Sequence, residues 1–214
     1  MKFKKISLQS LLKQTKDTEK IKENVLNTFN GRGKSEVSDF LHNKSIDYEQ
    51  RSLSSTYLIY NDRSQLVGYF TISNKGLIIS KENYEKLLKK QQKKLSFNGR
   101  KLENGDYIVN SFLLGQLGKN FNKNILEEDK IKGVELLTIA YNLLIEIKNL
   151  INVKYLWIEC EDNKKLLDFY SNFGFKLIEN YVSNNGLKVR KLKILQKCID
   201  KLNVKIKRLE IHFF

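Results

Sequence analysis

The sequence predicts an α/β (α+β) fold, in which a mixed central sheet carries helices on both faces, with a helical insertion and a C-terminal extension. Two observations support this prediction. The expected elements follow one another as helices, hairpin, long strand, helix, strand, helix, strand and strand, an order typical of a sheet covered by helices. The helix expected from residue 133 onward is also apolar over more than one face, as a helix packed against a sheet is.

The first half of the chain is expected to supply helices and a hairpin. Apolar residues at partial helical spacing among charged ones predict a helical lead-in over residues 1 to about 30. Ser38 and Asp39 are candidate cap residues for a second helix that reaches about Gln50. The apolar residues 57–60 and 66–72 flank turn-forming residues, so they predict a β-hairpin.

The second half is expected to complete the sheet. Residues 73–106 are rich in Lys and Gln and predict a helical surface insertion, after which residues 107–117 form a strand too apolar for a sheet edge. A buried helix opens at Gly133, and further elements are a strand at 155–160, a helix ended by Gly174, and strands at 175–178 and 187–195. Residues 1–195 are therefore predicted to form one domain, followed by an extension over residues 196–214.

Composition excludes several classes of protein. With two cysteines and two histidines, the chain can form neither a disulfide framework nor a plausible zinc cluster, and a metal site is not expected. No apolar run is long enough for a transmembrane helix, and the basic start lacks the pattern of a secretory signal. A reduced cytoplasm is the expected compartment, with no membrane partner.

The formal net charge of +15 allows two interpretations. A lysine-rich, proline-free composition is what AT-rich codons produce, so the charge can be a solvated surface. It can also attract a polyanion such as RNA, since phosphate contacts dominate such binding. The charge is uneven: residues 81–101 hold eight basic and two acidic residues, and residues 188–210 hold nine basic and two acidic residues.

Three stretches together resemble a known superfamily. Residues 163–175 follow the pattern Asn-x-x-Leu-x-x-Phe-Tyr-x-x-x-Gly-Phe, which is similar to the acyl-CoA-binding end of the GNAT acetyltransferases. Residues 113–120 and 133–137 resemble the pantetheine strand and pyrophosphate loop of the same superfamily. Residues 39–41, 55–58 and 66–70 resemble the branch that contains small GNAT toxins paired with ribbon-helix-helix antitoxins.

The resemblance implies a set of site residues. Tyr170 would be the general acid that protonates the leaving CoA thiolate, and Asn163 would hydrogen-bond the cofactor arm. Backbone groups would contact the pantetheine, and cations and a glycine at the next helix start would hold the pyrophosphate. The residues implied for the first role are Leu114, Gly115, Gln116 and Leu117, and those for the second are Lys130, Lys132 and Gly133. The loop departs from the superfamily's usual pattern Gln/Arg-x-x-Gly-x-Gly/Ala, because residues 128–133 keep only the last glycine and place the acids Glu128 and Asp129 near the expected phosphate.

Each candidate also has a structural interpretation. Tyr170 can pack beside Phe169 with its hydroxyl on a backbone carbonyl, and Asn163 can cap a helix. Cys160 is expected to be a small buried hydrophobe, and His42 and His212 are isolated. Glu159 and Glu161 could orient an amine or relay its proton, or they could be surface residues that cap a neighbouring element. The apolar spacing over residues 194–214 predicts a packing or homodimer helix.

The resemblance implies an N-acetyltransferase that moves the acetyl group of acetyl-CoA to a primary amine by direct attack. The acceptor is unidentified. The toxin-like branch implies the aminoacyl end of a charged tRNA as one acceptor and a ribbon-helix-helix antitoxin as a partner. From a different class, a catalytically degenerate GNAT-fold binding module for RNA or a protein partner stays open, because the pyrophosphate loop departs from the usual pattern.

Overall fold

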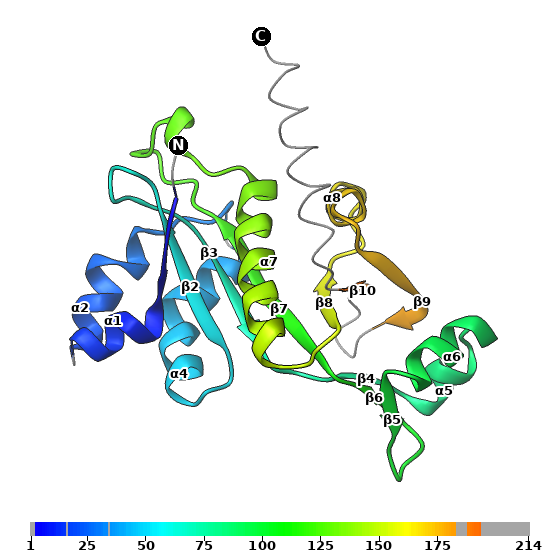
Figure 1. The fold of residues 1–214 in the computed structure, drawn as a ribbon. Helices are drawn as coiled ribbons and strands as arrows, with labels where there is room; N and C mark the ends of the chain where they lie inside the picture. Colours follow the sequence, from blue (N-terminus) through cyan, green and yellow to red (C-terminus); the bar gives the residue numbers. More distant parts are fainter. Residues whose placement is uncertain (1–2, 16, 34, 183–187, 194–214) are drawn as a thin grey trace. The chain divides into compact units, whose positions relative to one another are not determined.

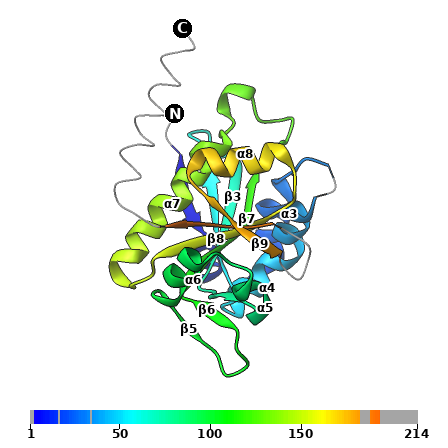
Figure 2. The same cartoon turned by 90° about the vertical axis from the view of Figure 1, so that its right-hand side faces the viewer.

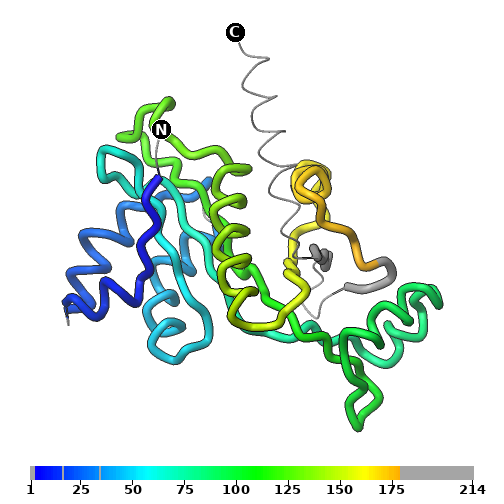
Figure 3. The backbone as a smooth tube through the Cα atoms, in the orientation of Figure 1, coloured from blue at the N-terminus to red at the C-terminus, as the bar shows by residue number. Residues whose placement is uncertain are grey.

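The structure is a computed structural model that describes residues 3–15, 17–33, 35–182 and 188–193. Figure 3 traces the backbone of most of these residues in colour. The chain divides into two compact units. The first takes residues 1–73 and 114–140, and the second takes residues 74–113 and 141–214. The predicted helix over residues 194–214 lies outside the described residues, and so does His212.

The described strands form two sheets. The larger has the order β1-β2-β3-β7-β8-β10-β9 and the smaller the order β4-β6-β5. Strand β7 (Ser111–Lys119) contributes to both units, because the division falls between Leu113 and Leu114. Its pairing with β8 (Tyr155–Cys160) is parallel, whereas the pairs β1–β2, β2–β3, β8–β10 and β10–β9 are antiparallel. The predicted mixed sheet is therefore confirmed, with β7 away from its edges.

The first unit opens with a strand that the sequence did not predict (Figure 1). Strand β1 (Lys4–Ser7) pairs with β2, and helix α1 (Leu8–Gln14) begins directly after it, capped by the Ser7 hydroxyl. Helix α2 (Thr18–Asn24) and the short 3₁₀ turn η1 (Leu26–Thr28) follow. The prediction of an uninterrupted helical lead-in was wrong at its start, because four residues are too few to show a strand period and β1 depends on pairing with β2.

The second predicted helix is present but begins earlier. It consists of α3 (Glu36–Asp39), a π-helical segment η2 (Phe40–Lys44) and α4 (Ser45–Gln50). The cap is Ser35, whose hydroxyl accepts the Ser38 N–H at 3.3 Å, so the predicted caps were misplaced. The Ser38 hydroxyl instead accepts the Gly31 N–H at 2.8 Å and holds the preceding loop. Apolar side chains of α1, α2, η1 with the residue after it, and η2 form a core with β2 and β3: Leu8, Ile21, Leu26, Phe29, Phe40, Leu41, Leu58, Leu66 and Tyr69.

The predicted hairpin is confirmed as β2 (Ser55–Tyr60) and β3 (Leu66–Ser73). Its turn is organised by Asn61, whose side-chain oxygen accepts the N–H groups of Arg63 and Gln65 at 3.0 and 2.9 Å. Strand β3 is buried over almost its whole length, which fits its place inside the sheet.

In the second unit, residues 73–106 are only partly helical (Figure 1). Helices α5 (Lys81–Glu85) and α6 (Lys89–Ser96) lie between strands β4 (Leu77–Ile79) and β5 (Gly99–Lys101). Both strands pair with β6 (Tyr107–Val109) to form the smaller sheet, so the predicted helical insertion contains the two helices and also two strands that the sequence did not predict. The predicted strand over residues 107–117 also divides at Asn110 between the two sheets.

The remaining elements of the second unit match the prediction closely. Helix α8 (Lys164–Phe173) follows β8, and Figure 2 shows it above β8 and β9 in that view. Strand β9 (Lys176–Val182) is followed by β10 (Lys188–Lys193), which pairs between β8 and β9. Helix α7 (Gly133–Leu150) begins in the first unit and ends in the second.

Candidate functional site

In the first unit, strand β7 has backbone groups along both of its edges, one toward β3 and one away from it. The Gln116 N–H donates to the Thr71 hydroxyl of β3 at 2.9 Å, and the Asn120 N–H donates to the Val67 carbonyl at 2.8 Å. Backbone groups of successive strand residues point to opposite edges, so those of Gly115 and Leu117 point away from β3. Leu114, Gly115, Gln116 and Leu117 were all predicted to contact a pantetheine, but only Gly115 and Leu117 have backbone groups on this second edge.

Gly115 is needed for the contact with β3. A Cβ atom at this position would lie 3.0 Å from the Thr71 hydroxyl oxygen, the same oxygen that accepts the Gln116 N–H. A larger residue would push this hydroxyl aside. Glycine at this position therefore serves strand packing as well as close approach of a ligand.

The start of helix α7 carries an unexpected carboxylate. The Glu135 side chain accepts the Lys132 N–H at 2.7 Å, whereas the Lys132 side chain is exposed and without an acidic partner among the described residues. The first N–H groups of a helix lack intrahelical partners, so Gly133 and the residues after it present donors to an anion. Sequence reasoning missed Glu135, although a glutamate three residues after the position of the cap is a recognisable signal.

Two acids of the preceding loop, Glu127 and Asp129, are neutralised locally. The Lys130 ammonium lies 2.7 Å from a Glu127 carboxylate oxygen, and its hydrogen bond lowers the pKa of Glu127. Asp129 is buried, and its carboxylate lies 3.0 Å from the Arg63 guanidinium in the β2–β3 turn. The charge of Lys130 is thus already engaged, which leaves Lys132 as the better placed of the two predicted cations.

In the second unit, Asn163 caps helix α8. Its side-chain oxygen accepts the Lys165 N–H at 2.9 Å, so the cap interpretation is confirmed. The exposed side-chain NH₂ group is left to donate to a ligand.

Tyr170 lies on the last turn of α8, between two phenylalanine rings. The ring centroids of Phe169 and Phe175 lie 5.0 and 5.5 Å from that of Tyr170, both in edge-on geometry. The helix ends at Gly174 in the left-handed region, with φ of 113°, and the Phe175 N–H donates to the Tyr170 carbonyl at 2.9 Å. This C-cap fixes the backbone of Tyr170 and places Phe175 against its ring.

The Tyr170 hydroxyl is held in its neutral form. Burial raises the pKa of Tyr170 to about 12, and the nearby Cys160 adds to the shift. Within the described residues its hydroxyl has no hydrogen-bond partner, so the predicted alternative of a bond to a backbone carbonyl is not found there. A half-buried phenol with a free O–H at neutral pH can donate its proton to a ligand.

The other candidates have structural roles or no distinct chemistry. Cys160 is buried on β8, as expected of a small hydrophobe. The His42 Nε2 lies 2.9 Å from the Phe29 carbonyl oxygen, a contact that ties the helical segment to the preceding turn. Glu161 is exposed and Glu159 is half-buried. The described part of the chain has neither a cluster of metal-ligating residues nor a helix long and apolar enough to span a bilayer.

Comparisons with known proteins identify the fold. The chain matches no protein-family model and no curated protein. Among solved structures, AtaT complexed with acetyl-methionyl-tRNAfMet is 19% identical with a TM-score of 0.58, over 94% of this chain and 99% of AtaT. A tyrosine-to-phenylalanine mutant of KacT is 18% identical with a TM-score of 0.60, over 94% and 99%. AtaTR bound with acetyl-CoA is 16% identical with a TM-score of 0.55, over 95% and 98%.

These similarities extend over nearly the whole chain. They show that the protein has the GNAT fold of the AtaT and KacT toxins, as the motifs in residues 113–175 predicted. At identities below one fifth, the shared fold by itself does not establish a shared reaction or substrate.

Proposed function

We propose that this protein is a GNAT-type N-acetyltransferase that uses acetyl-CoA as donor and a primary amine as acceptor. The observation that carries the proposal is Tyr170: a neutral phenol, fixed by a helix C-cap and free of hydrogen-bond partners among the described residues. Acetyl-CoA, when bound, supplies an activated thioester. The chain must then orient the acetyl group and deliver a proton to the departing sulfur.

Three features of the chain fit the donor. The edge of β7 that points away from β3 offers backbone groups of Gly115 and Leu117 for an extended amide-bearing arm. The start of α7 offers N–H donors and the Lys132 ammonium for phosphates. Asn163 has a side-chain NH₂ group free to donate.

Tyr170 would act as general acid. Its hydroxyl proton would pass to the thiolate as the acceptor amine displaces it, and the acceptor nitrogen would lose a proton to solvent or base. Direct attack needs no covalent enzyme intermediate, which agrees with the structural roles of Cys160 and His42. A pKa of about 12 keeps the phenol protonated over the whole physiological range.

We propose the aminoacyl end of a charged tRNA as the acceptor. AtaT, a structural neighbour, is seen with acetyl-methionyl-tRNAfMet, and the concentration of basic residues between 81 and 101 suits a phosphate backbone. An antitoxin partner follows from the same neighbours, since AtaT is also seen bound to the antitoxin AtaR.

The test is calorimetric titration with acetyl-CoA, with CoA and ATP as comparisons, followed by acetyl transfer to charged tRNA, free peptides and polyamines. We expect acetyl-CoA to bind. When its concentration is about 100 times the measured dissociation constant, it should raise the apparent free energy of unfolding by about 2.7 kcal/mol. We expect charged tRNA to be the best acceptor. Binding of acetyl-CoA without acetyl transfer to any of these amines would refute the proposal that the protein is an acetyltransferase.

A second function is favoured by one observation. The carboxylate of Glu135 already occupies a backbone donor at the start of α7, and the loop before it lacks the usual glycines. A binding module that keeps the GNAT fold without catalysis would show this pattern. It predicts no acetyl-CoA binding at millimolar ligand, the opposite result in the same titration.

A further inference from the structure

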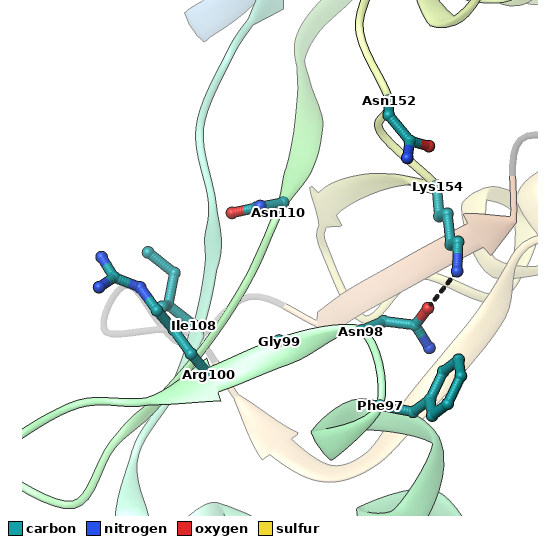
Figure 4. Close-up of a pocket in the computed structure, with 8 residues that line it drawn as sticks. All are labelled: Phe97, Asn98, Gly99, Arg100, Ile108, Asn110, Asn152 and Lys154. Atoms are coloured by element: carbon teal, nitrogen blue, oxygen red, sulfur yellow. Dashed lines mark hydrogen bonds between the residues drawn. The ribbon is translucent and has the colours of Figure 1, made fainter.

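The second unit contains a pocket of about 310 Å³ whose lining includes none of the residues proposed to hold acetyl-CoA. It lies where the end of α6 and strand β5 meet the residues directly before β7 and β8, and Figure 4 shows its lining. Its volume is near the lower limit of about 300–1,000 Å³ typical of small-molecule sites. The lining residues are Phe97, Asn98, Gly99, Arg100, Ile108, Asn110, Asn152 and Lys154.

The lining carries positive charge without an acid. Arg100 and Lys154 lie at opposite ends of the pocket (Figure 4), and neither has an acidic partner among the described residues. The Lys154 ammonium is instead positioned by the Asn98 side-chain oxygen at 2.9 Å. Asn98 is itself fixed, because its NH₂ group donates to the Lys94 carbonyl at 2.7 Å and to the Tyr155 hydroxyl at 3.2 Å.

An aromatic ring lies at one end of the pocket. Phe97 is 82% exposed, and the Lys154 ammonium lies 5.6 Å from its ring centroid. Exposing a whole phenylalanine ring is unfavourable in water, so a partner that covers it would gain stability. The pair of ring and ammonium offers a stacking surface beside a positive charge.

The polar groups of the pocket suit hydrogen bonding to a base. Asn110 and Asn152 are exposed and have no hydrogen-bond partner within the described part of the chain. Each amide offers donors and an acceptor, the combination that reads the edge of an unpaired base. Aromatic stacking next to cations is how proteins bind single strands.

We propose that this pocket binds one unpaired nucleotide of a single-stranded nucleic acid. The base stacks on Phe97, the amides of Asn110 and Asn152 contact its edge, and Lys154 and Arg100 contact the phosphates on its two sides. The rest of the nucleic-acid strand continues over the surface of residues 81–101, which contain eight basic and two acidic residues. A duplex base is not accessible for stacking, so a double-stranded ligand does not fit the pocket in this way.

This site is separate from the proposed acetyl-CoA site, although its Arg100 belongs to the basic stretch of residues 81–101 that we also propose for the acceptor tRNA. None of its residues is among those proposed to hold acetyl-CoA or to move a proton, and binding requires no donor. A failure of strand binding can therefore be distinguished from a failure of acetyl-CoA binding or of proton transfer by Tyr170.

The experiment is fluorescence anisotropy without acetyl-CoA, using a labelled single strand of about eight nucleotides. It is run with ribose and deoxyribose forms, with the duplex of the same sequence, with a mononucleotide and with polyglutamate. Phe97→Ala, Arg100→Ala and Lys154→Ala test the pocket. Leu88→Ala removes another exposed apolar side chain of the same insertion, and Lys13→Ala removes a charge from an exposed position in the first unit. Circular dichroism confirms that each variant is folded.

We expect the single strand to bind more tightly than the duplex or the mononucleotide. Phe97→Ala should weaken binding about tenfold, a typical loss for one stacked base, whereas Phe97→Tyr keeps it. Arg100→Ala and Lys154→Ala should each reduce the salt dependence of binding by about 0.7 in the log–log slope. The proposal is overturned if the pocket variants bind like the two controls, or if the duplex, mononucleotide or polyglutamate binds as tightly as the single strand.

Discussion

Replacing Asn120, directly after β7, should cost the first unit much of its stability. The side chain is 1% exposed and uses its full hydrogen-bonding capacity. Its oxygen accepts the N–H groups of Asn30 and Asn122, both at 2.9 Å, and its NH₂ group donates to the carbonyls of Thr28 at 3.0 Å and Leu66 at 2.6 Å. It thus joins the end of β7 to β3 and to the segment before α3.

The magnitude follows from these four bonds. A net contribution of about 1 kcal/mol for each gives about 4 kcal/mol for Asn120→Ala, and access of water to the part-buried groups reduces this to about 2–4 kcal/mol. In a chain of this length we expect the melting temperature to fall by roughly 5–15 °C. Urea unfolding followed by circular dichroism measures the loss, with the exposed Asn124→Ala as the matched control at about 0.5 kcal/mol or less. A loss for Asn120→Ala no larger than that of the control would refute the reasoning.

Three further predictions concern other single residues. Burial raises the pKa of the Glu49 carboxyl, although its carboxylate accepts the Thr56 N–H. The contribution of Glu49 to the free energy of unfolding is therefore fully present below the pKa of an unfolded glutamate, and it is lost as pH rises through the raised pKa of the folded state. Glu49→Gln should thus stabilise the protein at pH 7 but not at pH 4 in urea unfolding, and equal effects at both would contradict this. Glu135→Gln should tighten acetyl-CoA binding about two- to fivefold, because it removes one negative charge from the start of a helix. Calorimetry measures the dissociation constant, and an equal change for the exposed Glu128→Gln would contradict this prediction. Gly174→Ala should cost about 1–2 kcal/mol because of its positive φ, and a loss below about 0.5 kcal/mol would show that the cap tolerates a side chain.

The elements that the sequence predicted correctly are those with strong local signals. The hairpin has Asn61 in its turn, helix α7 has a long apolar pattern, and α8 has a capping residue before it and Gly174 after it. Each signal acts within a few residues of the element it defines. Local chemistry was therefore enough to place them.

The missed elements depend on pairing partners distant in sequence. Strands β4 and β5 have three residues each, too few to show a period, and exist because both pair with β6. The break at Asn110 passes the chain from one sheet to the other, although apolar residues lie on both sides of it, at 107–109 and 112–114. The indole N–H of Trp157 donates to the Lys75 carbonyl at 2.9 Å, a contact that no local pattern predicts.

For the candidate site, the sequence predicted residues but not their surroundings. The motif placed Tyr170 at the end of a helix and Asn163 at its start, as observed. It did not show that Lys130 is engaged by Glu127, because that requires the folded loop. Nor did it separate Gly115 and Leu117 from Leu114 and Gln116, since that division depends on the alignment of β7 with β3.

The most direct test of acetyl transfer by this protein is the steady-state rate of Tyr170→Phe with acetyl-CoA and the best acceptor. The variant keeps both ring contacts, and only the hydroxyl is lost. We predict a fall in kcat of about 10²–10⁴-fold with the Kd for acetyl-CoA unchanged, and a wild-type rate that does not decline between about pH 8 and 10, because the phenol stays protonated there. A variant that keeps the wild-type kcat while binding acetyl-CoA normally would contradict the proposed role of Tyr170 and the mechanism built on it.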